Sequence, residues 1–251
     1  MALTRRQFLA GAAALPAVQC AGWERAGRAE APELAACLIS SSESGALQRE
    51  WLAGYQEALA SLALPCTVMR PGGACRARLA IFPAADLSEA GDCEWIRTLA
   101  ARGSTVLVET AAAFLCAEEW NRQALHVENH LGLRLHPARS LWSEGRDRAA
   151  IPYVELAWPA AVRVRDYSRV IGVSGGEGVP LAAVEGLPCG ARKRIGAGTL
   201  LFLGSPVGPH LRAKDREALH WFRSLCSSCS LGCGLFPTPP APPRHPKLKS
   251  A

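Results

Sequence analysis

The chain has 251 residues, of which 49% are hydrophobic and 20% are charged, as is typical of a globular protein with a sizeable core. Its net charge is +6, but five of these positive charges lie near the two ends of the chain, which leaves +1 between residues 31 and 234. A nearly neutral body excludes the basic surface that nucleic-acid binding requires, so we expect no nucleic-acid partner.

The first residues predict an export signal. Residues 4–9 read T-R-R-Q-F-L, and a weakly apolar stretch rich in Ala and Gly follows them. Such a stretch after a short positive region is typical of a targeting segment, and this one is too short to span a bilayer. The pattern resembles the twin-arginine translocation signal, although Ala10 stands where that signal has Lys. Four residues carry the resemblance: Arg5, Arg6, Phe8 and Leu9.

The resemblance implies that the twin-arginine translocase is a partner during export and that the protein is periplasmic or secreted. That route carries folded proteins, which often have a cofactor, but the sequence identifies no cofactor here. Beyond the signal, no stretch is long and apolar enough to span a membrane, so we expect no transmembrane segment in the mature protein.

Strands and helices alternate in the first half of the chain. Four short apolar runs bounded by turn residues predict buried strands: Leu34–Ser40, Pro65–Met69, Arg78–Ala84 and Thr105–Val108. Apolar residues with the 3.6-residue helical period predict a helix at about residues 46–63 and another that begins at Asp86. This alternation indicates parallel βαβ units.

The pattern changes after residue 126. Four short strand-like pieces follow without helical periodicity: Ile151–Leu156, Ala161–Val164, Arg169–Val173 and Pro180–Val184. We expect an antiparallel excursion there. Thr199–Leu203 predicts the strand that rejoins the sheet, and Asp215–Leu225 predicts a closing helix. The Pro-rich, basic end at Pro237–Ala251 predicts a disordered tail.

Three stretches resemble the class I glutamine amidotransferase-like superfamily: E-T-A-A-A-F at 109–114, Trp158-Pro159 before V-R-V-R-D-Y, and I-G-A-G-T-L-L-F-L-G-S-P-V-G-P-H-L-R-A-K-D at 195–215. The resemblance implies an α/β, flavodoxin-like three-layer fold with a mainly parallel sheet and an antiparallel excursion before the last strand. We expect a twin-arginine signal and linker (1–31), an amidotransferase-like α/β domain (32–234) and a Pro-rich tail (235–251).

The catalytic groups of that superfamily are missing from the matching positions. Its active members have a nucleophilic Cys on a glycine-flanked turn, whereas residues 109–114 hold three alanines and Cys116 lies beyond them. The superfamily's His and Glu follow a late strand as H-x-E, whereas His210 has no Glu two residues later. A thiolate needs a base within reach and a third group that orients it. We therefore identify no catalytic residue and expect no amidotransferase activity.

Polar residues cluster in the loops that would follow the parallel strands, and open α/β sheets bind ligands at that edge. The candidate ligand-binding residues are Ser41, Glu43, Glu109, Thr110, Ser205 and His210. A structural alternative is that Ser205 and His210 buttress the closing helix. Glu109 would then be a buried carboxylate satisfied by backbone amides.

We expect an exported, non-catalytic domain that binds a small ligand or a protein partner in the cell envelope. The alternative is a diverged envelope hydrolase or transferase with its site at the same strand ends. In that hypothesis Ser205 or Ser41 is the nucleophile and His210 is the base. The two hypotheses differ in whether a serine or thiol probe reacts with the protein.

Cysteine and histidine groups give three further candidates. Cys66 and Cys75 flank a turn-like segment and could be bridged in an oxidising compartment, while Cys37 lies in an apolar run and is interpreted as a small core residue. His126 and His130 are four residues apart but lack an identifiable third ligand, so we expect no metal site. The three C-terminal cysteines predict a local disulfide or unpaired thiols: Cys226, Cys229 and Cys233.

Overall fold

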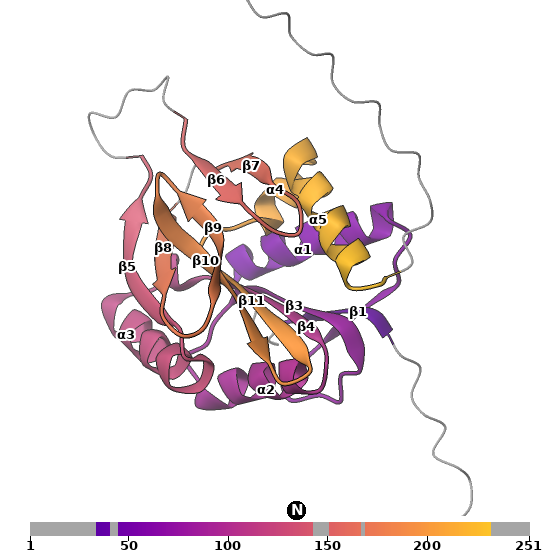
Figure 1. The fold of residues 1–251 in the computed structure, drawn as a ribbon, viewed down its shortest axis with the longest axis horizontal. Helices are drawn as coiled ribbons and strands as arrows, with labels where there is room; N and C mark the ends of the chain where they lie inside the picture. The colour runs from indigo at the N-terminus through magenta and orange to yellow at the C-terminus, as the bar shows by residue number, and fades with distance from the viewer. Residues whose placement is uncertain (1–33, 41–44, 143–150, 167–168, 232–251) are drawn as a thin grey trace, which may run out of the picture. The chain divides into compact units, whose positions relative to one another are not determined.

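The computed structural model describes residues 34–40, 45–142, 151–166 and 169–231, and the structural statements below concern these residues (Figure 1). The predicted signal at 1–31 and the predicted tail at 235–251 lie outside them. Within the described part, no helix is both long and apolar enough to cross a membrane.

A nine-stranded sheet organises the domain, in the order β2-β1-β3-β4-β11-β10-β9-β6-β7. Its parallel half consists of β1 (Leu34–Ile39), β2 (Cys66–Met69), β3 (Ala77–Ala85), β4 (Thr105–Thr110) and β11 (Gly198–Leu203). Its antiparallel half consists of β10 (Leu187–Ile195), β9 (Val179–Val184), β6 (Tyr153–Leu156) and β7 (Val162–Arg165). A separate antiparallel pair is formed by β5 (Arg134–Ser140) and β8 (Arg169–Ser174).

The expected flavodoxin-like three-layer fold with a mainly parallel sheet is therefore wrong. Four of the nine strands form an antiparallel half that extends the main sheet outward from β11. The expectation failed at Leu187–Ile195, which was not predicted as a strand because L-P-C-G-A-R-K-R-I lacks an apolar pattern. This strand joins the two halves, since it pairs with both β9 and β11.

Helices cover both faces of the sheet. They are α1 (Ala46–Ser61), α2 (Ala90–Ala101), α3 (Ala117–His126), α4 (Gly208–Arg212) and α5 (Arg216–Ser228), together with the 3-10 turn η1 (Ala112–Phe114) and the π-helical turn η2 (Val127–Leu131). Tyr55 of α1 and Phe222 of α5 pack in the core that contains Leu107, whereas Ile96 of α2 packs in the core that contains Val106. Adjacent residues of β4 thus face opposite cores, as strand geometry requires.

Local signals explain where these helices begin. Asp215 caps α5, because its Oδ1 accepts hydrogen bonds from the N–H groups of Glu217 (2.9 Å) and Ala218 (3.0 Å). The predicted start of α2 at Asp86 is wrong. The Asp86 carboxylate instead accepts the Ser88 N–H at 3.0 Å, and the helix begins at Ala90. At Asp86 this local hydrogen bond stays within the loop that precedes the helix.

Candidate functional site

A buried polar cluster lies where β4 ends beside β11. The register pairs Glu109 with Leu203, so the loop that follows β11 begins next to the Glu109 side chain. That loop is fixed to β8, because the Ile171 N–H donates to the Gly204 carbonyl at 2.8 Å. A Cβ at Gly204 would lie 2.3 Å from the Ile171 oxygen, so only glycine fits this contact. The loop is thereby held over the end of β4.

Glu109 is fully buried and holds the start of α4. Its Oε1 accepts hydrogen bonds from the Val207 N–H and from the Gly208 N–H, the latter at 3.0 Å. Burial raises the pKa of Glu109 to about 7, although the two amide hydrogen bonds oppose that rise. For Oε1 the structure thus matches the alternative in which backbone amides satisfy the Glu109 carboxylate.

Tyr55 of α1 completes this side of the cluster. Burial raises the pKa of Tyr55 well above its usual value, and the charge of the neighbouring Glu109 adds to this rise. Among the described residues, neither the Tyr55 hydroxyl nor Oε2 of Glu109 has a hydrogen-bond partner of good geometry. Tyr55 was not among the predicted site residues, because its position on the apolar face of α1 marks it only as a core side chain.

Ser205 is bound to a carboxylate that the sequence did not single out. Its hydroxyl donates to Oδ2 of Asp166 at 2.5 Å, and both side chains are buried. A serine hydroxyl has one proton, so in this arrangement Ser205 does not donate to His210 as a base-activated nucleophile would. Asp166 lies 39 residues away in sequence, and no local pattern could have linked the two.

His210 lies on α4 within the electrostatic reach of the same cluster. Burial lowers the pKa of the imidazole, while the carboxylates of Asp166 and Asp215 act in the opposite direction. Its neutral form is therefore favoured. The structure accordingly brings Glu109, Ser205 and His210 into one cluster and adds Tyr55 to it.

Among the other predicted ligand-binding residues, Thr110 is described by the structure and does not join this cluster. Thr110 follows Glu109 on the strand, so it faces the opposite side of the sheet. There its hydroxyl accepts hydrogen bonds from the Ala112 N–H (3.0 Å) and the Gln123 side-chain amide (2.7 Å). Ser41 and Glu43 lie outside the described residues, as do four signal residues: Arg5, Arg6, Phe8 and Leu9.

The buried position of this cluster indicates a structural role more directly than a catalytic one. Glu109 and Asp166 are 0% exposed and Ser205 is 1% exposed, so no substrate reaches these side chains in this conformation. Cys116 is exposed at the N-terminus of α3. It therefore lies beyond the turn that follows β4, as the sequence predicts. In this conformation the strand ends therefore present no accessible nucleophile from this cluster.

The histidine pair lies beside Glu94 of α2. The rings of His126 and His130 are 6.1 Å apart, and Nδ1 of His130 lies 3.7 Å from a carboxylate oxygen of Glu94. Glu128, which lies between the two histidines in sequence, instead pairs with Arg134 at 2.9 Å. Across the described ranges, no group of three or more His, Cys, Asp or Glu side chains is arranged to hold a metal ion.

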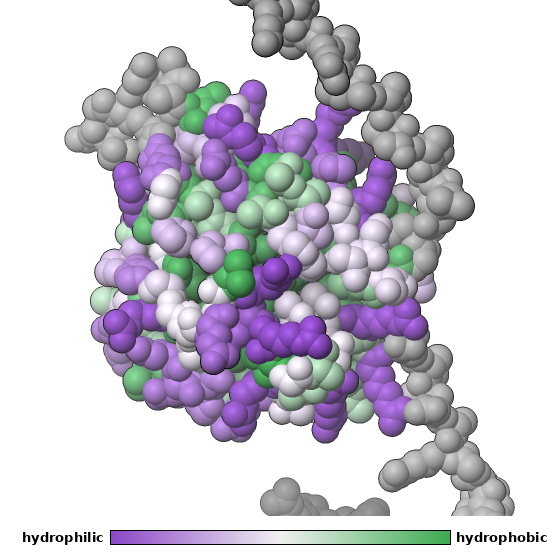
Figure 2. All heavy atoms as spheres, in the orientation of Figure 1, coloured by the Kyte–Doolittle hydropathy of each residue, from purple (hydrophilic) through white to green (hydrophobic). Residues whose placement is uncertain are grey.

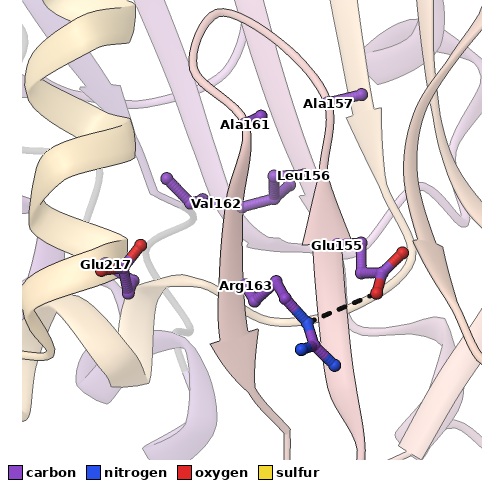
Figure 3. A pocket seen from close by; sticks show the side chains of 7 residues that line it. All are labelled: Glu155, Leu156, Ala157, Ala161, Val162, Arg163 and Glu217. Carbon is purple, nitrogen blue, oxygen red and sulfur yellow. Dashed lines mark ion pairs between the residues drawn. The ribbon is translucent and has the colours of Figure 1, made fainter. Parts of the chain in front are cut away.

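An open groove of about 630 Å³ lies between the β6–β7 hairpin and the first turn of α5 (Figure 3). It is lined by Glu155, Leu156, Ala157, Ala161, Val162, Arg163 and Glu217. Arg163 pairs with Glu155 at 3.4 Å and stacks on the Tyr153 ring at 4.6 Å, so its charge is already engaged. Polar and apolar side chains are interspersed on the face that Figure 2 shows.

The comparisons with known proteins concern the fold. No family model and no curated protein matches the chain. A β-galactosidase from Rahnella sp. R3 is similar in structure, with a TM-score of 0.61, 15% identity, and coverage of 79% of this chain and 32% of that one. An exo-β-1,4-mannosidase from Opitutaceae bacterium strain TAV5 has a TM-score of 0.54, 13% identity, and coverage of 77% and 36%.

A cytoplasmic protein from Salmonella typhimurium LT2 is also similar, with a TM-score of 0.55, 10% identity, and coverage of 77% of this chain and 98% of that one. The chain therefore spans about a third of the two glycosidases but nearly all of the Salmonella protein. At these identities the likeness shows the fold alone. None of these three proteins is described as an amidotransferase or a flavodoxin.

Proposed function

We propose that this chain acts in glycoside hydrolysis as an accessory domain that supplies no reacting group of its own. Its fold recurs in a β-galactosidase and in an exo-β-1,4-mannosidase, two enzymes named for different sugars. Glycoside hydrolysis is what these neighbours have in common. The Salmonella match covers 98% of that protein, which supports treating the fold as a self-contained unit that larger glycosidases also contain.

One observation carries the accessory role, and it is the burial of the polar cluster. Glu109 and Asp166 are 0% exposed, and Glu109 Oε1 is bound to the N–H groups of Val207 and Gly208. A general acid or base must lie within hydrogen-bond reach of the atom that it serves. These carboxyl groups reach only the protein's own backbone and side chains.

A second candidate is that the chain is itself a diverged hydrolase with its site at the strand ends. The glycosidase neighbours favour this hypothesis over a free-standing domain that binds a small ligand or an envelope protein. Two carboxyl groups in different environments support it, because burial raises the pKa of Glu109 to about 7 whereas Asp166 accepts a hydrogen bond from the Ser205 hydroxyl. Glycosidases use one protonated and one ionised carboxyl group. The cluster would have to open for a substrate to enter.

Hydrolysis of 4-nitrophenyl β-galactoside and β-mannoside by the full chain separates the two candidates. The accessory role predicts no release of nitrophenol above the blank. Release that is lost in both Glu109→Gln and Asp166→Asn, but kept in Glu57→Gln, would overturn the accessory role and establish the hydrolase. Glu57 is a suitable control because it is exposed on α1, away from the cluster.

Cross-linking in the envelope gives the positive test of the accessory role. We expect the partner that is cross-linked to the chain and identified by mass spectrometry to be a glycoside hydrolase. A chain that is recovered only uncross-linked, or only with proteins of other classes, would contradict the proposal.

Export by the twin-arginine route is part of the proposal. It rests on T-R-R-Q-F-L at residues 4–9. Replacing both Arg5 and Arg6 by Lys should leave the protein in the cytoplasm, whereas Arg25→Lys should not change its location. Equal amounts of all three proteins in the periplasmic fraction would refute this part.

A further inference from the structure

The connection from β2 to β3 carries Cys75 across β1. The two strands lie on either side of β1, to which both are parallel, and the sheet order is β2-β1-β3. The chain must therefore return from Met69 to Ala77 over one face of β1. Cys75 lies on this return segment, is 6% exposed, and packs in the same core as Cys37 of β1, which is 0% exposed.

The same topology separates Cys75 from Cys66. Cys66 is paired in register with Ala36, so the two residues point to the same face of the sheet. Both pack with the core on the α1 and α5 side, whereas Cys37 and Cys75 pack with the core on the α2 side. The bridge between Cys66 and Cys75 that their sequence spacing suggested would have to pass through the sheet. Cys75 faces Cys37 instead.

The two thiols interact, and the interaction shifts their pKa values in opposite directions. A hydrogen bond between the Cys37 and Cys75 side chains lowers the pKa of Cys75 to about 7, although burial acts in the opposite direction. The same contact, followed by burial, raises the pKa of Cys37 above its usual range. Cys75 is also the more exposed of the two, at 6% against 0%, so it is the sulfur that first meets an exogenous disulfide, and the thiolate is the form that attacks disulfides.

We propose that Cys37 and Cys75 form a disulfide bond when the folded protein meets an exogenous disulfide, such as oxidised glutathione or a disulfide-bearing protein. The Cys75 thiolate attacks one sulfur of that disulfide, forms a mixed disulfide and releases one thiolate. Cys37 gives up its proton and attacks the Cys75 sulfur, which expels the second thiolate. Two protein thiols are oxidised, the exogenous disulfide is reduced to two thiols, and the two protons pass to the released thiolates.

The second step is favoured by the first. The hydrogen bond and the charge of Cys75 are two of the causes that raise the pKa of Cys37. Both disappear once Cys75 is in a neutral mixed disulfide, so Cys37 becomes easier to deprotonate when its attack is required. The bond would join the β2–β3 connection to β1 and close the loop between residues 37 and 75. Loop closure of this length should raise Tm by about 10 °C.

Oxidation of the native full chain with oxidised glutathione at neutral pH tests the proposal. The remaining thiols are then alkylated after denaturation, and the peptides are analysed by mass spectrometry. We expect a linked pair of peptides that contains Cys37 and Cys75 and lacks two hydrogens, and a Tm that falls by about 10 °C on reduction. The outcome is decided by the linked peptide of the native protein. The test therefore remains valid even if a variant fails to fold.

Variants assign the linked sulfurs. Cys66 and Cys75 share one tryptic peptide, because the Arg70–Pro71 bond resists trypsin, so the assignment is made in the Cys66→Ser protein. The link should persist there and in the control Cys93→Ser, which removes another buried thiol of the same core. It should disappear in Cys75→Ser. A link from Cys75 to Cys66, a glutathione adduct without a link, or full alkylation of Cys37 and Cys75 would each overturn the proposal.

Discussion

Replacing Glu109 by Gln removes a buried charge but keeps an acceptor oxygen for the backbone amides of Val207 and Gly208. The new side-chain amide would face the Tyr55 hydroxyl, which has no other partner of good geometry among the described residues. We therefore expect the variant to fold and to differ from the native protein chiefly in its dependence on pH.

The magnitude follows from the pKa of the carboxyl group. Burial raises this pKa from 4.5 to about 7, and one pKa unit corresponds to about 1.4 kcal/mol. The folded state therefore binds the proton more tightly than the unfolded state. The stability that protonated Glu109 contributes is complete below pH 4.5 and is lost as the pH rises through about 7. The loss amounts to about 3 kcal/mol, or roughly 6–12 °C in Tm.

Urea unfolding of both proteins between pH 4.5 and about pH 8 measures this effect. The free energy of unfolding of Glu109→Gln relative to the native protein should rise across this interval, by about 3 kcal/mol in total. Glu57→Gln, an exposed change on α1, should show no such rise. Parallel curves for the native protein and Glu109→Gln would refute a raised pKa, and a free energy of unfolding of Glu109→Gln that falls relative to the native protein as the pH rises would show that Glu109 is needed as an anion.

Two further predictions concern packing and titration. Gly54→Ala should lose about 1–3 kcal/mol in urea unfolding. Its Cβ would lie 2.0 Å from the Gly208 carbonyl oxygen, so α1 and α4 would have to separate. In Gly91→Ala of α2 the new Cβ meets nothing within 4 Å, so the free energy of unfolding should rise by about 0.5–1 kcal/mol. Equal changes in the stability of the two variants would contradict the close contact between α1 and α4. The pKa of His210 measured by NMR should lie below 6.5, because burial favours the neutral imidazole. The stability that neutral His210 contributes to the fold should decline as the pH falls below 6.5. A measured pKa at or above 6.5 would contradict the burial of this side chain.

The individual strands and most helices could be predicted because their signals are local. The run at Thr199–Leu203 lies within β11, and the strand-like pieces of the middle region coincide with β6, β7, β8 and β9. Pairing was not predictable in the same way. An apolar run of five or six residues has the same pattern in a parallel and in an antiparallel strand, so the assumed family decided the topology, and decided it wrongly.

The candidate site shows the same division. Glu109, Ser205 and His210 each follow a predicted strand, which predicts that they lie at one edge of the sheet, and the structure does bring them together. Asp166 was missed because its partner Ser205 lies 39 residues further along the chain. Sequence spacing places Cys75 near Cys66 but says nothing of the face of the sheet on which each thiol lies, and the structure packs the two residues with different cores.

The sequence by itself determined which segments are apolar enough to be buried, that a helix follows near Asp215, and that residues 4–9 resemble a twin-arginine signal. Only the tertiary structure decided that β10 joins a parallel half to an antiparallel half, that Glu109 holds α4, and that Cys37 meets Cys75. The physical reason is that burial and capping depend on neighbouring residues, whereas strand partners and buried polar pairs depend on contacts between distant segments.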